Sequence, residues 1–169
     1  MKKSTYKIAL FGMLSAVALV LSYLESLIPT TAFMPMGVKA GFSNIATMFA
    51  ASSMGLPAAL AITLIKALFA GITRGVTAML MSFCGGMLST LVMYLLFRYT
   101  KAGYLLIGVI SALAHNLGQL TVAAFMVQSA TIIGYAPVLI ISGIITGAVT
   151  GSILRAVMPS LLKLVKGGI

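Results

Sequence analysis

Residues 103–127 read GYLLIGVISALAHNLGQLTVAAFMV and contain no Asp, Glu, Lys or Arg. The stretch is longer than the about 20 apolar residues that cross the hydrocarbon core of a bilayer as an α-helix. Its few strongly polar residues, such as His115 and Asn116, lie near its middle. Residues 103–127 therefore predict a transmembrane helix whose polar side chains face other parts of the protein rather than lipid.

The composition of the whole chain extends this prediction. Of 169 residues, 61% are hydrophobic and 7% are charged, and the mean hydropathy is +1.17. A soluble domain carries about 25% charged residues, so a water-soluble globular protein is excluded. Six helices of about 20 residues each leave enough sequence for tails and connections. We expect an all-α integral membrane protein, with one six-helix transmembrane domain over residues 1–169.

Glycine, proline and polar residues mark the expected breaks between helices. They place the six helices at about residues 6–28, 40–54, 57–73, 75–97, 103–127 and 135–158. The second and third are short for a full span, so we expect them to be tilted, kinked or interrupted. The first follows basic residues as a signal peptide does, but its apolar run exceeds the typical signal core of about 7–15 residues. We interpret it as a retained helix.

The formal net charge of +10 comes from eleven Lys and Arg residues against one acid. Most of these cations flank the expected helices at three places separated by pairs of spans, which indicates the positive-inside rule rather than nucleic-acid binding. They are Lys2, Lys3, Lys7, Arg98, Lys101, Arg155, Lys163 and Lys166. This distribution predicts a plasma-membrane protein whose N- and C-termini are both cytoplasmic.

Three cations do not fit the positive-inside pattern. Lys39 falls in the first outer connection, Arg74 at the outer end of the third helix, and Lys66 within that helix. A charge inside the membrane costs at least about 2.5 kcal/mol, so it needs a reason. One hypothesis is a site for a small anion, open to the outside. The alternative is structural: Lys66 extends toward the interface, and Glu25 pairs with Lys39 or Arg74.

Two further groups of polar residues accompany these cations. Ser111, His115 and Gln119 are spaced i, i+4, i+8 and share one face of their helix, which favours a polar cavity. For the neighbouring Asn116, a hydrogen bond between helices is the simpler interpretation. Near Lys39, the start of the second helix offers backbone amides with partial positive charge and the side chain of Asn44, which suits an anionic group.

The composition also excludes several kinds of chemistry. Glu25 is the only acid, and Cys84 and His115 are the only Cys and His. A pair of catalytic carboxylates, an Asp-rich magnesium site and a Cys/His zinc cluster all need more such residues. No Gly-rich Gly-Lys-Ser/Thr loop for ATP is present either. We expect no enzyme activity and no cofactor, so any transport energy has to come from a partner or a gradient.

Two rows of small residues permit close helix contacts. The first comprises Ala9, Gly12 and Ala16, and the second comprises Gly143, Gly147 and Gly151. We expect the second row to pack inside the protein. The first row has two open interpretations, internal packing or docking of another membrane protein.

Several motifs resemble those of a known family. They are SYLESLIP at residues 22–29, GVKAGFSNI at 37–45, AHNLGQL at 114–120 and the glycines of residues 142–151. The second resembles the family motif Gly-x-Lys-x-Gly-x-x-Asn, with Phe42-Ser43 in place of the usual Leu-Ala and the Asn retained. The family is the Gx transporter group, also labelled heptaprenyl diphosphate synthase component I, which is similar to the substrate-binding S components of energy-coupling factor (ECF) transporters.

The resemblance implies a six-helix S-component bundle with its ligand near the outer face, under the connection between the first two helices. It implies that Lys39, Asn44, His115, Asn116 and Gln119 contribute to the binding site. It further implies that small residues of the first helix dock a transmembrane coupling subunit, which carries two cytoplasmic ATPases. The candidate docking residues are Gly12 and Ala16, with Ala9 secondary.

These observations lead to one main functional hypothesis. The chain is expected to capture a small anionic, partly apolar compound from outside, either vitamin-like or an isoprenoid or quinone precursor. Lys39, Lys66 and Arg74 would receive its anionic group. One alternative is a non-catalytic membrane subunit that assists a prenyl diphosphate synthase, since such a synthase itself needs Mg²⁺ held by several carboxylates. Another is a small proton-coupled exporter that uses Glu25.

Overall fold

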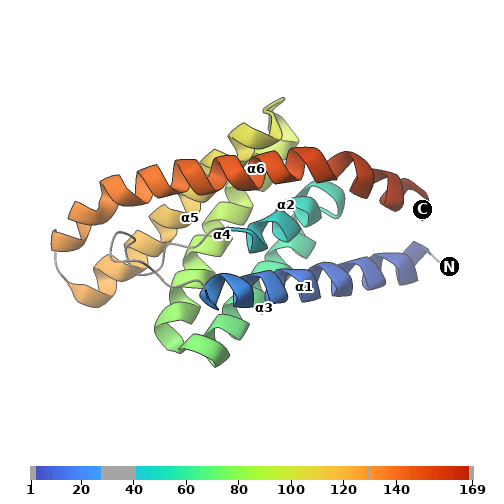
Figure 1. Cartoon of the computed structure of the whole chain (residues 1–169). Helices are drawn as coiled ribbons and strands as arrows, with labels where there is room; N and C mark the ends of the chain where they lie inside the picture. The colour runs from blue at the N-terminus through green and yellow to red at the C-terminus, as the bar shows by residue number, and fades with distance from the viewer. Residues whose placement is uncertain (1–2, 28–40, 129, 168–169) are drawn as a thin grey trace.

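The computed structural model describes residues 3–27, 41–128 and 130–167, all of which belong to helices or to short connections between them. The elements are α1 (Lys3–Leu27), α2 (Ser43–Ser53), α3 (Leu56–Arg74), α4 (Val76–Tyr99), α5 (Tyr104–Val127), the 3₁₀ helix η1 (Ala130–Tyr135) and α6 (Ala136–Gly167). The start of α1 and the end of α6 lie at the same end of the molecule (Figure 1). The predicted all-helical architecture is confirmed.

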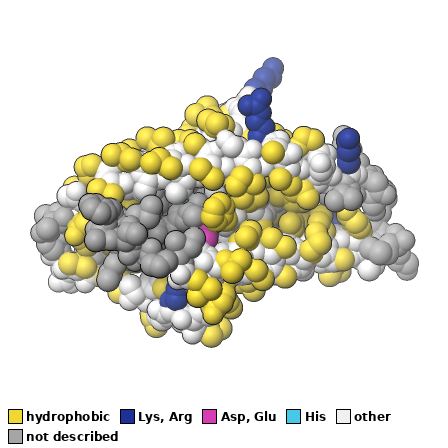
Figure 2. Space-filling view, in the orientation of Figure 1, with side chains coloured by type: hydrophobic (Ala, Val, Ile, Leu, Met, Phe, Trp, Pro, Cys, Tyr) yellow, Lys and Arg dark blue, Asp and Glu magenta, His cyan; other side chains and the backbone are white. Residues whose placement is uncertain are grey.

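Five of these helices are long and apolar enough to cross a membrane: α1, α3, α4, α5 and α6. In each, no more than a third of the most apolar window is buried inside the protein. Figure 2 shows hydrophobic side chains over much of the described surface of one face, with Lys and Arg at a few separate places. A surface this apolar suits lipid rather than water. The protein is a multi-pass membrane protein of the plasma membrane.

The second helix differs from the prediction. It begins at Ser43 rather than near residue 40 and ends at Ser53, so at 1.5 Å per residue it is about 16 Å long, about half of the hydrocarbon core. The described residues therefore contain five candidate spans where six were expected. Residues 28–40, which include the predicted outer connection, lie outside the described residues.

Helix α2 forms the centre of the bundle. It contacts α1, α3, α4 and α6. Six consecutive residues, 46–51, are all buried. The largest of them, Met48 and Phe49, join the hydrophobic core together with Ile62 and Met93 of the surrounding helices. Helix α2 therefore fills the interior of the bundle instead of facing lipid.

Glycines form the turns on both sides of α3. Gly55 has φ +94° and Gly75 has φ +90°, a backbone conformation that L side chains rarely adopt. Pro57 occupies the first turn of α3, where its missing N–H costs nothing. The breaks that the sequence predicted at these positions are confirmed.

The last helix is longer than predicted. We expected an end near Met158, but α6 continues through Pro159 to Gly167. Proline removes one helical hydrogen bond, and such a loss is tolerated when packing compensates for it. Met158 is 1% exposed, and Leu161 and Leu162 pack against the core beyond the proline. These contacts extend the helix past a residue that usually ends one.

Candidate functional site

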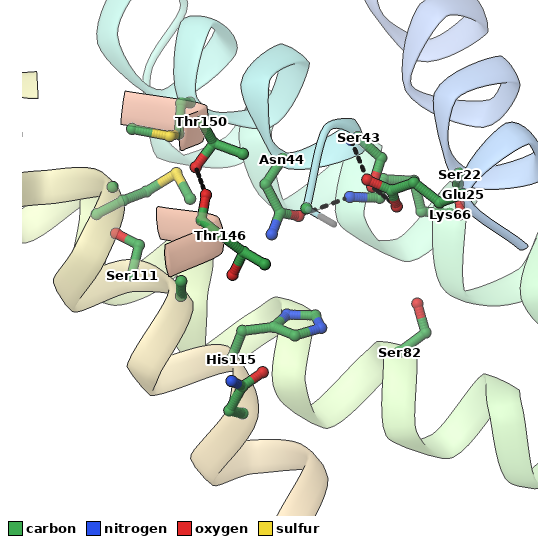
Figure 3. A pocket seen from close by; sticks show the side chains of 16 residues that line it. Ser22, Glu25, Ser43, Asn44, Lys66, Ser82, Ser111, His115, Thr146 and Thr150 are labelled. Carbon is green, nitrogen blue, oxygen red and sulfur yellow. Dashed lines mark hydrogen bonds between the residues drawn. The ribbon is translucent and has the colours of Figure 1, made fainter. Parts of the chain in front are cut away.

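A polar cavity opens between α1, α2, α3, α4, α5 and α6 (Figure 3). Six of its lining residues carry hydroxyl groups: Ser22, Ser43, Ser82, Ser111, Thr146 and Thr150. The other lining residues are Glu25, Gly41, Asn44, Met48, Lys66, Met93, Gly108, Ala112, His115 and Asn116. Because polar side chains are expensive inside a membrane protein, their convergence on one cavity indicates a binding site.

Glu25, on the last turn of α1, is bound to the first residue of α2. The Ser43 backbone N–H donates to Glu25 Oε1 at 3.1 Å, and Ser43 Oγ donates to Oε2 at 3.2 Å. Glu25 is 6% exposed. The first amides of a helix carry partial positive charge, which stabilises a carboxylate placed there. The only acid of the chain thus joins α1 to α2.

Lys66 approaches the same end of the cavity from α3. Its ammonium group donates to Asn44 Oδ1 at 2.9 Å (Figure 3). Lys66 is 7% exposed, so its side chain does not extend to the surface. Burial opposes its charge, and the Glu25 carboxylate, which lines the same cavity, partly offsets that effect. A buried ammonium with an opposite charge nearby and an amide oxygen as acceptor satisfies the usual condition for a buried charge.

Arg74 lies about two turns further along α3 and does not line the cavity. It is half-buried, and Glu25 attracts its charge as well. The sequence left open whether Glu25 pairs with Lys39 or with Arg74. Among the described residues, Glu25 is instead hydrogen-bonded to Ser43. Lys39 itself lies outside the described residues.

The three polar residues predicted to share one face of α5, Ser111, His115 and Gln119, have two different roles in the structure. Ser111 and His115 line the cavity, whereas Gln119 is buried but lies outside the lining. Gln119 packs where α5 crosses α4, next to Gly85. The predicted common face is present, and two of its three members reach the cavity.

Asn116 also lines the cavity, but its amide is engaged in the fold. The Asn116 side-chain N–H donates to the Leu139 carbonyl of α6 at 2.8 Å. This is the interhelical hydrogen bond that the sequence favoured for Asn116 alone. Its amide nitrogen is therefore held by α6 rather than directed at a ligand.

Sequence reasoning missed several lining residues. Thr146 and Thr150 stand one turn apart on α6 and were overlooked beside the glycine row of that helix. Ser22 precedes Glu25 by about one turn of α1, and Ser82 lies in the first third of α4. The i, i+4 pair of hydroxyls was a usable signal, because residues 136–154 of α6 contain no charged side chain. Ser22 and Ser82 gave no signal, because isolated serines occur throughout transmembrane helices.

The residues predicted to dock a partner lie on the outside of the bundle. Ala9, Gly12 and Ala16 are all exposed on α1. A Cβ atom added to Gly12 would meet nothing within 4 Å. The row leaves a shallow, uncovered surface of small side chains on α1.

A model of the family described as heptaprenyl diphosphate synthase component I matches residues 14–157. A solved structure with a similar fold is that of the S component of a bacterial ECF transporter. It is 19% identical, has a TM-score of 0.74 and matches 96% of this chain and 99% of its own. No curated protein matches the sequence. The resemblance inferred from the motifs is confirmed, and the fold is that of an S component.

Proposed function

The chain belongs to the family described as heptaprenyl diphosphate synthase component I, and on that premise we propose that it is the substrate-binding S component of an ECF-type transporter. It spans the membrane with both termini in the cytoplasm and captures a small anionic compound from outside. The observation that carries the proposal is the buried Lys66, bound to Asn44 in a cavity lined by hydroxyl groups. A membrane protein retains such a group for a function.

The proposed ligand is anchored mainly through polar contacts. Lys66 supplies positive charge from the cavity lining, and Arg74 supplies it from outside the lining, about two turns further along α3. Asn44 and His115 line the same cavity as Lys66. Lys39, whose motif the family shares, is proposed to approach from the outer connection. Met48 and Met93 give the cavity a limited apolar part, which suits a partly apolar compound, whether vitamin-like or a small isoprenoid or quinone precursor.

The proposed partner is a transmembrane coupling subunit with two cytoplasmic ATPases. Support comes from the fold and from the uncovered row of Ala9, Gly12 and Ala16. Small side chains let helices approach closely within a membrane. A partner is also needed for energy, because the chain has no Gly-Lys-Ser/Thr loop to bind ATP.

Native mass spectrometry of gently purified protein tests this function. The wild type is expected to retain a negatively charged small molecule, and part of the sample is expected to retain partner chains. Lys66→Gln removes the buried charge and should reduce the retained molecule at least about tenfold, since buried charged contacts cost several kcal/mol to lose.

Lys101→Gln is the matched control, because Lys101 is exposed and does not line the cavity. It should retain the molecule as the wild type does. A melting curve of Lys66→Gln separates lost binding from lost folding. Equal occupancy of all three proteins would refute the proposed anion site.

The family description favours a second candidate, a non-catalytic membrane subunit of a prenyl diphosphate synthase. The chain has one acid, Glu25, and therefore lacks the carboxylates that would hold Mg²⁺ on a diphosphate. In this role it would assist another chain. Co-purification of a soluble synthase whose activity rises with this protein present would favour the second candidate.

A further inference from the structure

The contacts of Glu25 form an anion-binding position filled by the protein itself. One residue, Ser43, donates to both carboxylate oxygens, at 3.1 Å from its N–H and 3.2 Å from its Oγ. Ser43 begins α2, a helix of 11 residues, so the position also has the positive end of a helix dipole. Two donors matched to two oxygens are suited to a planar carboxylate.

The surrounding charge reinforces this position. Lys66 lines the same cavity as Glu25 and Ser43 (Figure 3), and the Glu25 carboxylate partly offsets the larger, opposing effect of burial on the charges of Lys66 and Arg74. Lys66 gives one hydrogen bond to Asn44 Oδ1, and an ammonium group has three donors. The same groups would attract any other carboxylate that occupied the place of Glu25.

A separate observation indicates that the cavity is made for a ligand. Ser111 lines it from α5 and is 2% exposed. Within the described structure, its Oγ has no hydrogen-bond partner. A buried polar group without a partner is unfavourable, so a hydroxyl kept in this state suits a group that comes from outside the protein.

The size of the cavity limits how a ligand enters. Its interior volume is about 30 Å³, within a wider hollow of about 580 Å³ that includes the open mouth. A volume of about 30 Å³ has room for only a few water molecules, whereas small-molecule sites occupy at least about 300 Å³. A ligand therefore needs some lining side chains to move away.

We propose that the ligand carries a carboxylate, and that Glu25 holds the place of this carboxylate when no ligand is bound. On binding, the ligand oxygens accept from the Ser43 N–H and Oγ, and Glu25 moves out of the position. Lys66 and Arg74 compensate the incoming charge as they compensate that of Glu25. This inference rests on the proposed function, since it names the chemical class of the ligand for the same site.

Acetate, a free carboxylate, tests the exchange directly. In the full-length protein, Glu25→Ala empties the position and should lower the melting temperature. Sodium acetate should then raise it by several degrees with saturation, as a specific ligand does. Sodium chloride at equal ionic strength should not. The wild type, whose position is filled by Glu25, should respond to acetate no more than to chloride.

Ser22→Ala is the matched control. Ser22 lies one turn before Glu25 on α1, lines the same cavity and is 2% exposed. Its replacement removes a buried polar group without emptying the anion position, so acetate should have no specific effect. If Glu25→Ala gains no more from acetate than Ser22→Ala does, the proposal is wrong.

A second variant, Glu25→Gln, covers the case in which Glu25→Ala does not fold. Glutamine keeps the shape but loses the charge, so acetate should compete with it and stabilise this variant more than chloride does. Absence of an acetate-specific effect in this variant would overturn the proposal. Such a failure leaves the transporter function standing if partner chains and a retained anion are still found with the wild type.

Discussion

Two helices, α1 and α6, each carry a row of small residues, but the two rows differ in how closely a neighbouring helix packs against them. Gly143, Gly147 and Gly151 of α6 face α5, and a Cβ atom added to Gly147 would lie 2.5 Å from Val109 Cα. On α1, a Cβ atom added to Gly12 would meet nothing within 4 Å. One row is filled by a neighbouring helix of the same chain, and the other is uncovered.

The comparison distinguishes two roles of small residues in membrane helices, close packing within the chain and contact with a partner. The backbones of α5 and α6 approach so closely that a Cβ atom added to Gly151 would be 2.6 Å from the Tyr104 carbonyl oxygen. This contact fixes α5, and with it His115 and Ser111, against the cavity. The small residues of α1 are exposed within the described structure, which suits the proposed contact with a partner helix.

The largest expected effect follows from filling the packed row. Gly147→Leu would place a side chain where the backbones of α5 and α6 meet. We expect a loss of at least about 3 kcal/mol of stability or no folded protein, since overpacking by even one or two methylenes costs about 1–3 kcal/mol. Thermal unfolding in detergent measures this. Val149→Leu, at a neighbouring exposed position, should melt as the wild type does.

A glycine-to-leucine substitution in the exposed row of α1 should leave stability unchanged and weaken partner binding instead. Gly12→Leu adds a side chain into open space, so the melting temperature should not fall. Co-purification of the coupling subunit should decrease at least about tenfold, because small residues at a membrane helix interface permit the close approach on which association depends.

Val17→Leu is the control for Gly12→Leu, since Val17 is exposed on α1 but away from the row of small residues. It should keep both stability and partner. If Gly12→Leu retained the partner at the wild-type level, α1 would not be the docking helix. If it unfolded the protein, the contrast between the two rows would be lost.

A smaller loss of stability is expected when the hydrogen bond between Asn116 of α5 and α6 is removed. Asn116→Leu removes the hydrogen bond from α5 to the Leu139 carbonyl. Such bonds in membrane proteins contribute about 0.6 kcal/mol on average, so the melting temperature should fall by only a few degrees. Asn116→Asp should fall further, because a carboxylate cannot donate to a carbonyl. An unchanged melting temperature in both variants would show that glycine packing alone holds α5 to α6.

Much of the fold was predictable because the bilayer acts on local sequence. Long apolar runs such as residues 103–127 identify spans wherever they occur, and Gly55 and Gly75 mark turns through their own backbone freedom. The length of α2 and the continuation of α6 through Pro159 were not predictable. Both depend on contacts with core residues of other helices.

Single residues of the candidate site were predictable from the sequence, but the contacts between them were not. Lys66 could be selected from the sequence alone, because a cation within an apolar helix indicates a functional residue even when its partners are not known. Its acceptor Asn44 is 22 residues away, and Ser43 is 18 residues from Glu25. Helical periodicity cannot select such partners. It likewise grouped Gln119 with His115, although only His115 reaches the cavity.

By itself, the sequence determined that this protein lies in a membrane, that its helices are broken at particular glycines, and to which family it belongs. These properties depend on each residue and its near neighbours in the chain. Only the tertiary structure decided that Ser43 holds the single acid and which row of small residues is left uncovered. Those outcomes depend on which helices meet, and helix contacts are set by the shapes of surfaces that are distant in sequence.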